Sequence, residues 1–136
     1  MLKYLITYLG AGFSIAVLDA VYLTVAGQRV YRPTLDYALA DKPALPAVIA
    51  FYLMYVAGVV VLAILPNRDA GLPKTARTGA LLGAFGYATY DLTNQATLKV
   101  WATRITLIDI AWGTVLTCAA ASVGYLAWRW SAKRFG

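Results

Sequence analysis

The stretch YATYDLTNQATLKVWATRITLIDIAWGT, residues 87–114, places two aspartates and a block of amides inside a chain that is otherwise nearly all apolar. Its central connection, Lys99–Arg104, is very short and lies between two long apolar segments. Short connections between helices join antiparallel neighbours. The stretch therefore predicts a tight helical hairpin that carries Asp91 on one arm and Asp109 on the other.

Beyond this hairpin, the composition of the whole chain predicts a membrane protein. The chain has 136 residues, of which 61% are hydrophobic and 13% charged, against about 45–50% and about 25% in soluble domains. A helix needs about 20 residues to cross a bilayer core, and four segments are long enough: Tyr4–Ala26, Ala44–Leu65, Thr78–Leu98 and Ile105–Trp128. The predicted fold class is an all-α integral membrane protein, one domain over residues 1–136 that forms a four-transmembrane-helix bundle, with helices at about 4–26, 44–65, 76–98 and 105–129.

The first segment and the connection after it carry two further expectations. The segment is longer than the apolar core of a signal peptide and no small-x-small cleavage site follows it, so a retained helix is expected. The connection contains Pro33, Pro43 and Pro46, which disfavour a continuous helix. Within it, residues 34–40 are expected to form a short interfacial helix.

The basic residues predict an orientation rather than a nucleic-acid partner. An even number of spans puts both termini on one side, with seven basic residues: Lys3, Arg68, Lys74, Arg77, Arg129, Lys133 and Arg134. The other side has five: Arg29, Arg32, Lys42, Lys99 and Arg104. The positive-inside rule then favours both termini in the cytoplasm. No continuous basic patch results, so nucleic acid is excluded as a partner.

Half of the acidic residues fall where they are most costly. All six are aspartates, and Asp19, Asp91 and Asp109 lie inside predicted spans. A charged side chain at the bilayer centre costs at least ~2.5–3.5 kcal/mol, which points to a functional site inside the bundle. At about 1.5 Å per residue, Asp19 lies ~24 Å, Asp91 ~21 Å and Asp109 ~8 Å from the basic residue that precedes each span. Since the spans alternate in direction, the three carboxylates are expected near one level.

Helical spacing surrounds these acids with polar and aromatic side chains. Tyr87, Asp91, Asn94 and Gln95 share one face of the third span, beside small residues that include Ala80 and Ala84, as expected for i, i+3 and i+4 steps. The predicted pocket has candidate catalytic residues Asp91, Asp109 and Asp19, and candidate ligand-binding residues Asn94, Gln95, Tyr87, Trp112, Tyr22, Lys99 and Arg104. Its rim is cationic, from Arg29, Arg32, Lys99 and Arg104.

The two acids of the hairpin also have structural interpretations. Thr106 and Asp109 are spaced like a capping box, which would put Asp109 in the first turn of the last helix. Asp91 can pair with Lys99 or Arg104 across the short connection. Both alternatives stay open on the sequence.

Other residues of the predicted pocket have structural interpretations as well. Asp19 can be bound by a tyrosine or threonine of a neighbouring helix. Asn94 and Gln95 can satisfy backbone groups where the third span ends. Gly79 and Gly83 form the one GxxxG motif of that span, and packing within the chain is favoured over dimerisation.

No cofactor is expected. The chain has no histidine, and its one cysteine, Cys118, excludes an intrachain disulfide. Aspartate and amide oxygens suit Mg²⁺ or Ca²⁺, but their spacing matches no recognised ligand motif. No metal site is therefore assigned.

Five short motifs resemble one known family over nearly the whole chain. They are LDAVYL (residues 18–23), LADKP (39–43), FYLMYVAG (51–58), YATYDLTNQATLK (87–99) followed by Trp101, and DIAWGT (109–114). The pattern is similar to a prokaryotic family of small membrane proteins called domain of unknown function 2177. The resemblance implies four helices in the bacterial inner membrane and no established activity. It also implies association with fatty-acyl-modifying enzymes through neighbouring genes. Where the family commonly has tryptophan, this chain has Tyr22.

Two classes of function follow from the predicted pocket. In the first, it binds or modifies a lipid-like amphiphile, with membrane lipids as partners and Asp91 and Asp109 as an acid/base pair that shares one proton. In the second, the acids form a proton or cation relay in a small transporter, which would need a homo-oligomer. An assembly subunit for a membrane enzyme, such as a lipid-modifying enzyme, is a further alternative.

Overall fold

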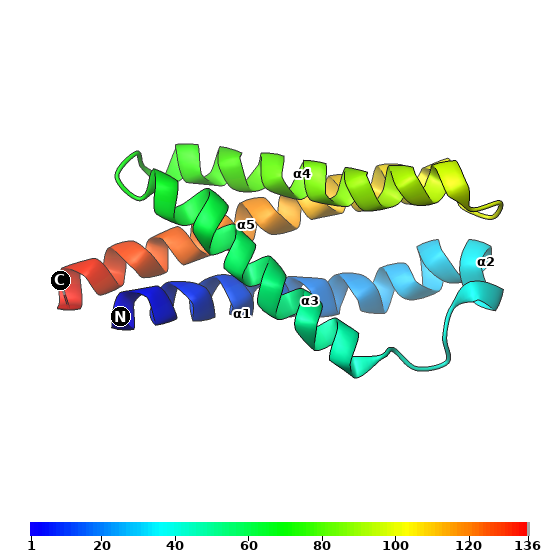
Figure 1. The fold of residues 1–136 in the computed structure, drawn as a ribbon, viewed down its shortest axis with the longest axis horizontal. Coiled ribbons are helices and arrows are strands. Elements are labelled where there is room, and N and C mark those ends of the chain that lie inside the picture. The colour runs from blue at the N-terminus through cyan, green and yellow to red at the C-terminus, as the bar shows by residue number, and fades with distance from the viewer. Residues whose placement is uncertain (136) are drawn as a thin grey trace.

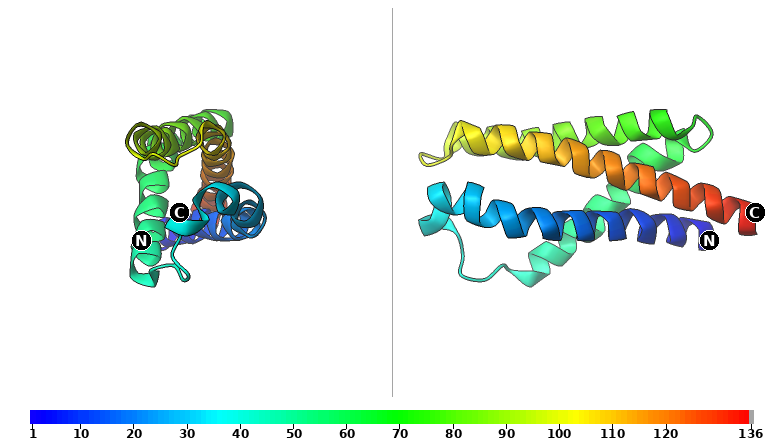
Figure 2. Two further views of the ribbon diagram at one scale, coloured as in Figure 1. Left: turned by 90° about the vertical axis from the view of Figure 1, so that its right-hand side faces the viewer. Right: turned by 180° about the vertical axis from the view of Figure 1, so that it is seen from behind.

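The computed structural model describes residues 1–135, and its long elements are all helices. They are α1 (Leu2–Ala26), α3 (Leu45–Gly58), α4 (Leu72–Thr97) and α5 (Thr103–Phe135). Helices α1, α4 and α5 run side by side, α3 crosses them obliquely, and both termini lie at the same end (Figure 1). Seen end-on, the four helices have a roughly square outline (Figure 2). The predicted all-helical architecture is confirmed.

Three helical segments are long and apolar enough to cross a membrane: Leu2–Ala38, Leu45–Asn67 and Thr103–Phe135. Helix α4 is as long as a span, at ~39 Å for its 26 residues, but it is more polar than the others. It lies along α5 over its whole length and so covers the same depth (Figures 1 and 2). Its lower hydropathy comes partly from its buried face, which carries Thr75, Gly79, Gly83 and Asp91. The rest comes from polar residues near its ends, which include Lys74, Arg77, Asn94 and Gln95.

The first helix does not end where the sequence predicted. It passes from α1 through a π-helical turn at Gly27–Tyr31 into α2 (Arg32–Leu35) and a 3₁₀ turn at Asp36–Ala38. The expected separate interfacial helix over residues 34–40 is therefore wrong. Proline lacks the N–H that would bind the carbonyl four residues earlier, which for Pro33 is the carbonyl of Arg29. The wider π turn accommodates the proline, and the guanidinium of Arg104 donates to the Arg29 carbonyl at 3.2 Å.

A second π-helical turn follows α3, at Val59–Ile64, directly before a 3₁₀ turn that contains Pro66. Helix α3 itself contacts α1, whereas this π turn contacts α4 and α5. The first half of α3 thus diverges from α4, as the oblique crossing in Figure 1 shows. The divergence leaves a wedge between the two helices.

Helices α4 and α5 approach each other closely at two glycines of α4, Gly79 and Gly83. A methyl group on Gly79 would lie 2.7 Å from the carbonyl oxygen of Thr117, and one on Gly83 would lie 2.0 Å from that of Gly113. The motif therefore serves packing within the chain, as favoured from the sequence. The centre of the buried face is the glycine row, while Ala80 and Ala84, predicted to lie on this face, are only half-buried.

The apolar core occupies the half of the bundle nearer the termini. It contains Ala11, Ile15, Val56, Val59, Val60, Ala63, Ile64, Leu116, Ala120, Ala121 and Tyr125. Large apolar side chains also face outward, including Phe13, Met54 and Phe85, which are 72%, 75% and 71% exposed. Such an apolar outer surface is suited to lipid.

Candidate functional site

Asp109 is the centre of a buried hydrogen-bond network. It lies on α5 and is 6% exposed. Its Oδ1 accepts from the hydroxyl of Tyr22 on α1 at 2.9 Å and from the hydroxyl of Tyr31 in the π turn. The two phenol oxygens lie 3.2 Å apart. Two phenols from the first helical segment thus converge on one carboxylate oxygen of the last helix.

The capping role predicted for Asp109 is wrong. Helix α5 begins at Thr103, so Asp109 lies almost two turns inside it. The Thr106 hydroxyl instead donates to Oε1 of Gln95 at 2.7 Å, and the Gln95 amide donates to Thr103 at 2.9 Å. Gln95 therefore joins the two arms of the hairpin and lies outside the carboxylate network.

Asp91 is buried without a hydrogen-bond donor. It is 0% exposed, and neither of its oxygens has a hydrogen-bond partner among the described residues. The carboxyl of Asp109 lies beside it. It does not pair with Lys99 or Arg104, which are exposed, so that structural alternative is wrong. Because two ionised carboxylates side by side repel each other, the pair is less costly when one of the two carboxyls is protonated.

Asp19 forms a second carboxylate centre on α1. Its oxygens accept from the hydroxyl of Tyr52 on α3 and from the indole N–H of Trp112 on α5 at 3.1 Å. The structural alternative for Asp19, a bond from a tyrosine of a neighbouring helix, is therefore present. The Trp112 indole stacks on Tyr22, with ring centroids 4.3 Å apart and planes at 6°. This stack connects the Asp19 centre to the Asp109 centre.

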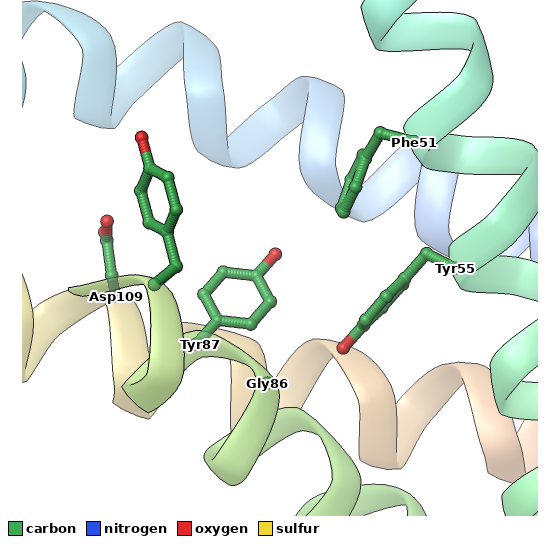
Figure 3. A pocket seen from close by; sticks show the side chains of 6 residues that line it. Phe51, Tyr55, Gly86, Tyr87 and Asp109 are labelled. Atoms are coloured by element: carbon green, nitrogen blue, oxygen red, sulfur yellow. The ribbon is translucent and has the colours of Figure 1, made fainter. Parts of the chain in front are cut away.

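A cleft of about 470 Å³ opens beside Asp109. It is lined by Phe51, Tyr55, Gly86, Tyr87, Tyr90 and Asp109. Figure 3 shows Asp109 at one end, Phe51 and Tyr55 at the other, and the ring of Tyr87 between them. The volume lies within the range of about 300–1,000 Å³ found for small-molecule sites. The cleft is aromatic along most of its wall and has one carboxylate.

The cleft occupies the wedge between α3 and α4 and opens to the side of the bundle. Two of its lining residues, Phe51 and Tyr90, are 46% and 64% exposed on the apolar outer surface. The deeper wall is fixed, since the Tyr55 hydroxyl lies 2.6 Å from that of Thr117, which donates to the Gly113 carbonyl at 2.7 Å. Asp109, although only 6% exposed, therefore lines a cleft that opens laterally between α3 and α4.

The structure separates the predicted site residues into two groups. Asp19, Asp91, Asp109, Tyr22, Tyr87 and Trp112 lie in the network or line the cleft. Asn94, Gln95, Lys99 and Arg104 lie toward the hairpin connection and line no part of the cleft. The Asn94 carbonyl accepts from the N–H of Leu98 at 2.8 Å, as at a helix end. The predicted cationic rim is thus absent from the cleft wall.

Sequence reasoning missed the aromatic residues Tyr31, Phe51, Tyr52, Tyr55 and Tyr90. The motif FYLMY does place Phe51, Tyr52 and Tyr55 together at i, i+1 and i+4, which was a usable signal of an aromatic face. No sequence pattern pointed to Tyr31, because it follows the expected end of the first helix and was expected to lie in a loop. Only the π turn brings its hydroxyl to Asp109.

The described residues contain no group of three or more acidic, cysteine or histidine side chains suited to a metal ion. Asp19 is held by Tyr52 and Trp112, apart from the Asp91–Asp109 pair. The carboxylates therefore form one pair and one separate centre.

Residues 4–126 match a family described as predicted membrane protein DUF2177. The matched range contains every residue of the carboxylate network and the cleft. The chain belongs to the DUF2177 family. This match confirms the family resemblance that was inferred from the sequence motifs. It also agrees with the apolar helices of the structure, which are long enough to cross a membrane. No match to the chain was found among curated proteins or among solved structures.

The substitution Tyr31→Phe tests the network around Asp109. It removes one hydroxyl donor to a buried carboxylate and keeps the ring, so the free energy of unfolding is expected to fall by about 1–2 kcal/mol. Thermal unfolding in detergent measures the change. Tyr37→Phe is the matched control, because Tyr37 is 71% exposed. Equal stability of both variants would contradict the bond from Tyr31 to Asp109.

Proposed function

We propose that this DUF2177 protein binds an amphiphile from the membrane in the cleft between α3 and α4, and that the Asp91–Asp109 pair carries acid–base chemistry on its polar head. One observation carries the proposal. Asp109 lines the lateral cleft and also belongs to the buried network with Tyr22, Tyr31 and Asp91. A ligand in the cleft would therefore contact Asp109, the carboxylate beside the buried carboxyl of Asp91.

The hydrogen bonds support different proposed roles for the two acids. Two phenol donors stabilise the charged form of Asp109, which suits a general base facing the cleft. Asp91 has no donor among the described residues and no exposed atom, so the neutral acid is its less costly form. Asp109 would take a proton from the ligand and later give a proton back to it, while Asp91, behind Asp109, would hold a second proton that keeps the pair from carrying two negative charges. Paired acids in different environments are a recurring solution for acid–base chemistry near neutral pH.

The proposal also includes the membrane in which the protein lies and the side on which its termini lie. The termini lie at one end of the bundle (Figure 1), and seven basic residues are assigned to that side against five on the other. This asymmetry supports cytoplasmic termini in a bacterial inner membrane. The cleft would then receive amphiphiles from the outer half of the bilayer.

Untargeted lipidomics on a deletion strain tests the function. The strain is complemented at matched expression with wild type, Asp91→Asn or Asp109→Asn. Wild type is expected to restore a lipid species that neither variant restores, because each variant removes one member of the proton-sharing pair. Asp36→Asn serves as the control, since Asp36 is exposed in the connection after α2. Lipid profiles that do not respond to wild type would overturn the proposal.

One observation favours a second candidate, a proton or cation relay. The hydroxyls of Tyr22 and Tyr31 lie 3.2 Å apart and extend the Asp91–Asp109 pair toward the α1–α2 end of the bundle. A chain of hydroxyls and carboxyls can pass protons. Flux of protons into liposomes by wild type but not by Asp109→Asn would support this candidate over the first.

A further inference from the structure

The wall of the cleft contains rings and an acid and lacks a cation. Its lining residues are four aromatic side chains, one glycine and Asp109. Lys99 and Arg104, the two basic residues predicted for the binding site, do not line the cleft. Both are exposed, and the Arg104 guanidinium donates to the Arg29 carbonyl. The one salt bridge among the described residues, Arg68–Asp69, lies at the turn before α4. Among residues 1–135, the buried acids therefore have no positively charged partner.

The rings stand in different planes around the cleft. Phe51 and Tyr55 are stacked, with centroids 5.3 Å apart and planes at 23°. Tyr87 meets Tyr55 edge-on, at 6.4 Å and 74°. The faces of aromatic rings carry partial negative charge, and such surrounding rings recognise ammonium groups through cation–π interactions.

The charges point the same way. With Asp91 neutral, as proposed above, the Asp91–Asp109 pair carries one negative charge, and no basic side chain lines the cleft to balance it. An ammonium group in the cleft would supply that balance at Asp109, whereas a phosphate or carboxylate head would add a second negative charge without a counterion. The two phenols that donate to Asp109 are neutral, and the buried Asp91 beside it supplies no positive charge either.

We propose that the ligand of this cleft is a cationic amphiphile, whose ammonium head lies between Asp109 and the rings of Phe51, Tyr55 and Tyr87 and whose apolar tail leaves the cleft toward the lipid. The inference rests on the proposed amphiphile site and names its ligand class. The tail exits where Phe51 and Tyr90 are exposed on the outer surface. On the way from the lipid to Asp109, the ammonium head passes along the mainly aromatic lining of the cleft.

The test compares three probes with the same ten-carbon chain, decyltrimethylammonium, decanol and decyl phosphate. Each is titrated into the protein in neutral dodecyl maltoside micelles, and bound ligand is counted by native mass spectrometry. One decyltrimethylammonium per protein is expected, at least about tenfold tighter than either other probe, since only this head combines charge balance with cation–π contacts. Asp109→Asn is expected to remove this preference.

A second variant separates the rings from the carboxylate. Phe51→Leu is expected to weaken decyltrimethylammonium about threefold to tenfold and to leave decanol unchanged, because leucine fills space but has no π face. Phe13→Leu is the matched control on the lipid-facing side of α1, where Phe13 is 72% exposed. Circular dichroism and size exclusion verify the fold of each variant. If Asp109→Asn does not fold, the Phe51 and Phe13 pair decides the test.

The outcomes are distinct. Tighter binding of the ammonium probe, sensitive to Phe51 and Asp109, supports the inference. Equal or tighter Asp109-dependent binding of decanol or decyl phosphate overturns the ammonium assignment and leaves the amphiphile site standing. Absence of Asp109-dependent binding for all three probes overturns both the inference and the proposed function.

Discussion

Replacing Gly83 by alanine is expected to lower the free energy of unfolding by about 3 kcal/mol or more, or to prevent folding. The new methyl group would lie 2.0 Å from the backbone oxygen of Gly113 and 2.6 Å from the Thr117 hydroxyl. Two helix backbones must separate to admit it, which costs more than moving a flexible side chain. Fluorescence-detected size exclusion after heating measures the loss of folded protein in detergent.

Gly58→Ala is the control for this prediction. Gly58 lies at the end of α3, and a methyl group there meets no atom within 4 Å. Alanine favours a helix over glycine by about 1 kcal/mol, so stability should stay the same or rise. A Gly83→Ala variant as stable as wild type would show that α4 and α5 do not approach each other this closely.

Asp91→Asn is expected to raise the stability of the protein while it abolishes the proposed function. The carboxyl of Asp91 is buried without a donor and lies beside that of Asp109. An amide can donate to the Asp109 carboxylate without first taking up a proton, as a carboxyl must near neutral pH, so the free energy of unfolding should rise by about 1–2 kcal/mol. Thermal unfolding in detergent measures stability, and lipid profiles of the complemented strain measure function.

The opposite shifts in stability and function distinguish a functional acid from a structural one. Residues kept for function commonly lower stability, and their replacement commonly raises it. Asp36→Asn, at an exposed position, should change neither quantity. A marked loss of stability in Asp91→Asn would contradict the prediction, since it would mean that the carboxyl itself holds the fold together.

Much of the fold was predictable because lipid imposes simple rules on the sequence. Apolar length located the helical segment Leu45–Asn67 and the start of α5 to within a few residues, although α5 continues to Phe135. The fixed rise of a helix predicted Asp19, Asp91 and Asp109 near one level. The structure connects Asp19 to Asp109 through Trp112 and Tyr22, and Asp91 lies beside Asp109. Their chemical roles remain predictions.

The errors have equally specific causes. The first helix was expected to end near Ala26, with Pro33 in the connection after it, but a π turn and the Arg104 guanidinium satisfy the backbone that the proline disturbs. Spacing along one helix placed Asn94 and Gln95 with Asp91, whereas contacts across the hairpin direct Gln95 to Thr103 and Thr106. Periodicity describes a face of one helix and does not say which part of that face a neighbour covers.

By itself, the sequence determined that the chain is a helical membrane protein with three carboxylates at one depth, because hydropathy and helical rise act locally along the chain. Only the tertiary structure decided which groups surround those carboxylates. The π turn that delivers Tyr31 and the oblique α3 that opens the cleft both depend on packing between distant segments. That packing is set by backbone hydrogen bonds and close glycine contacts, which no residue pattern within one helix encodes.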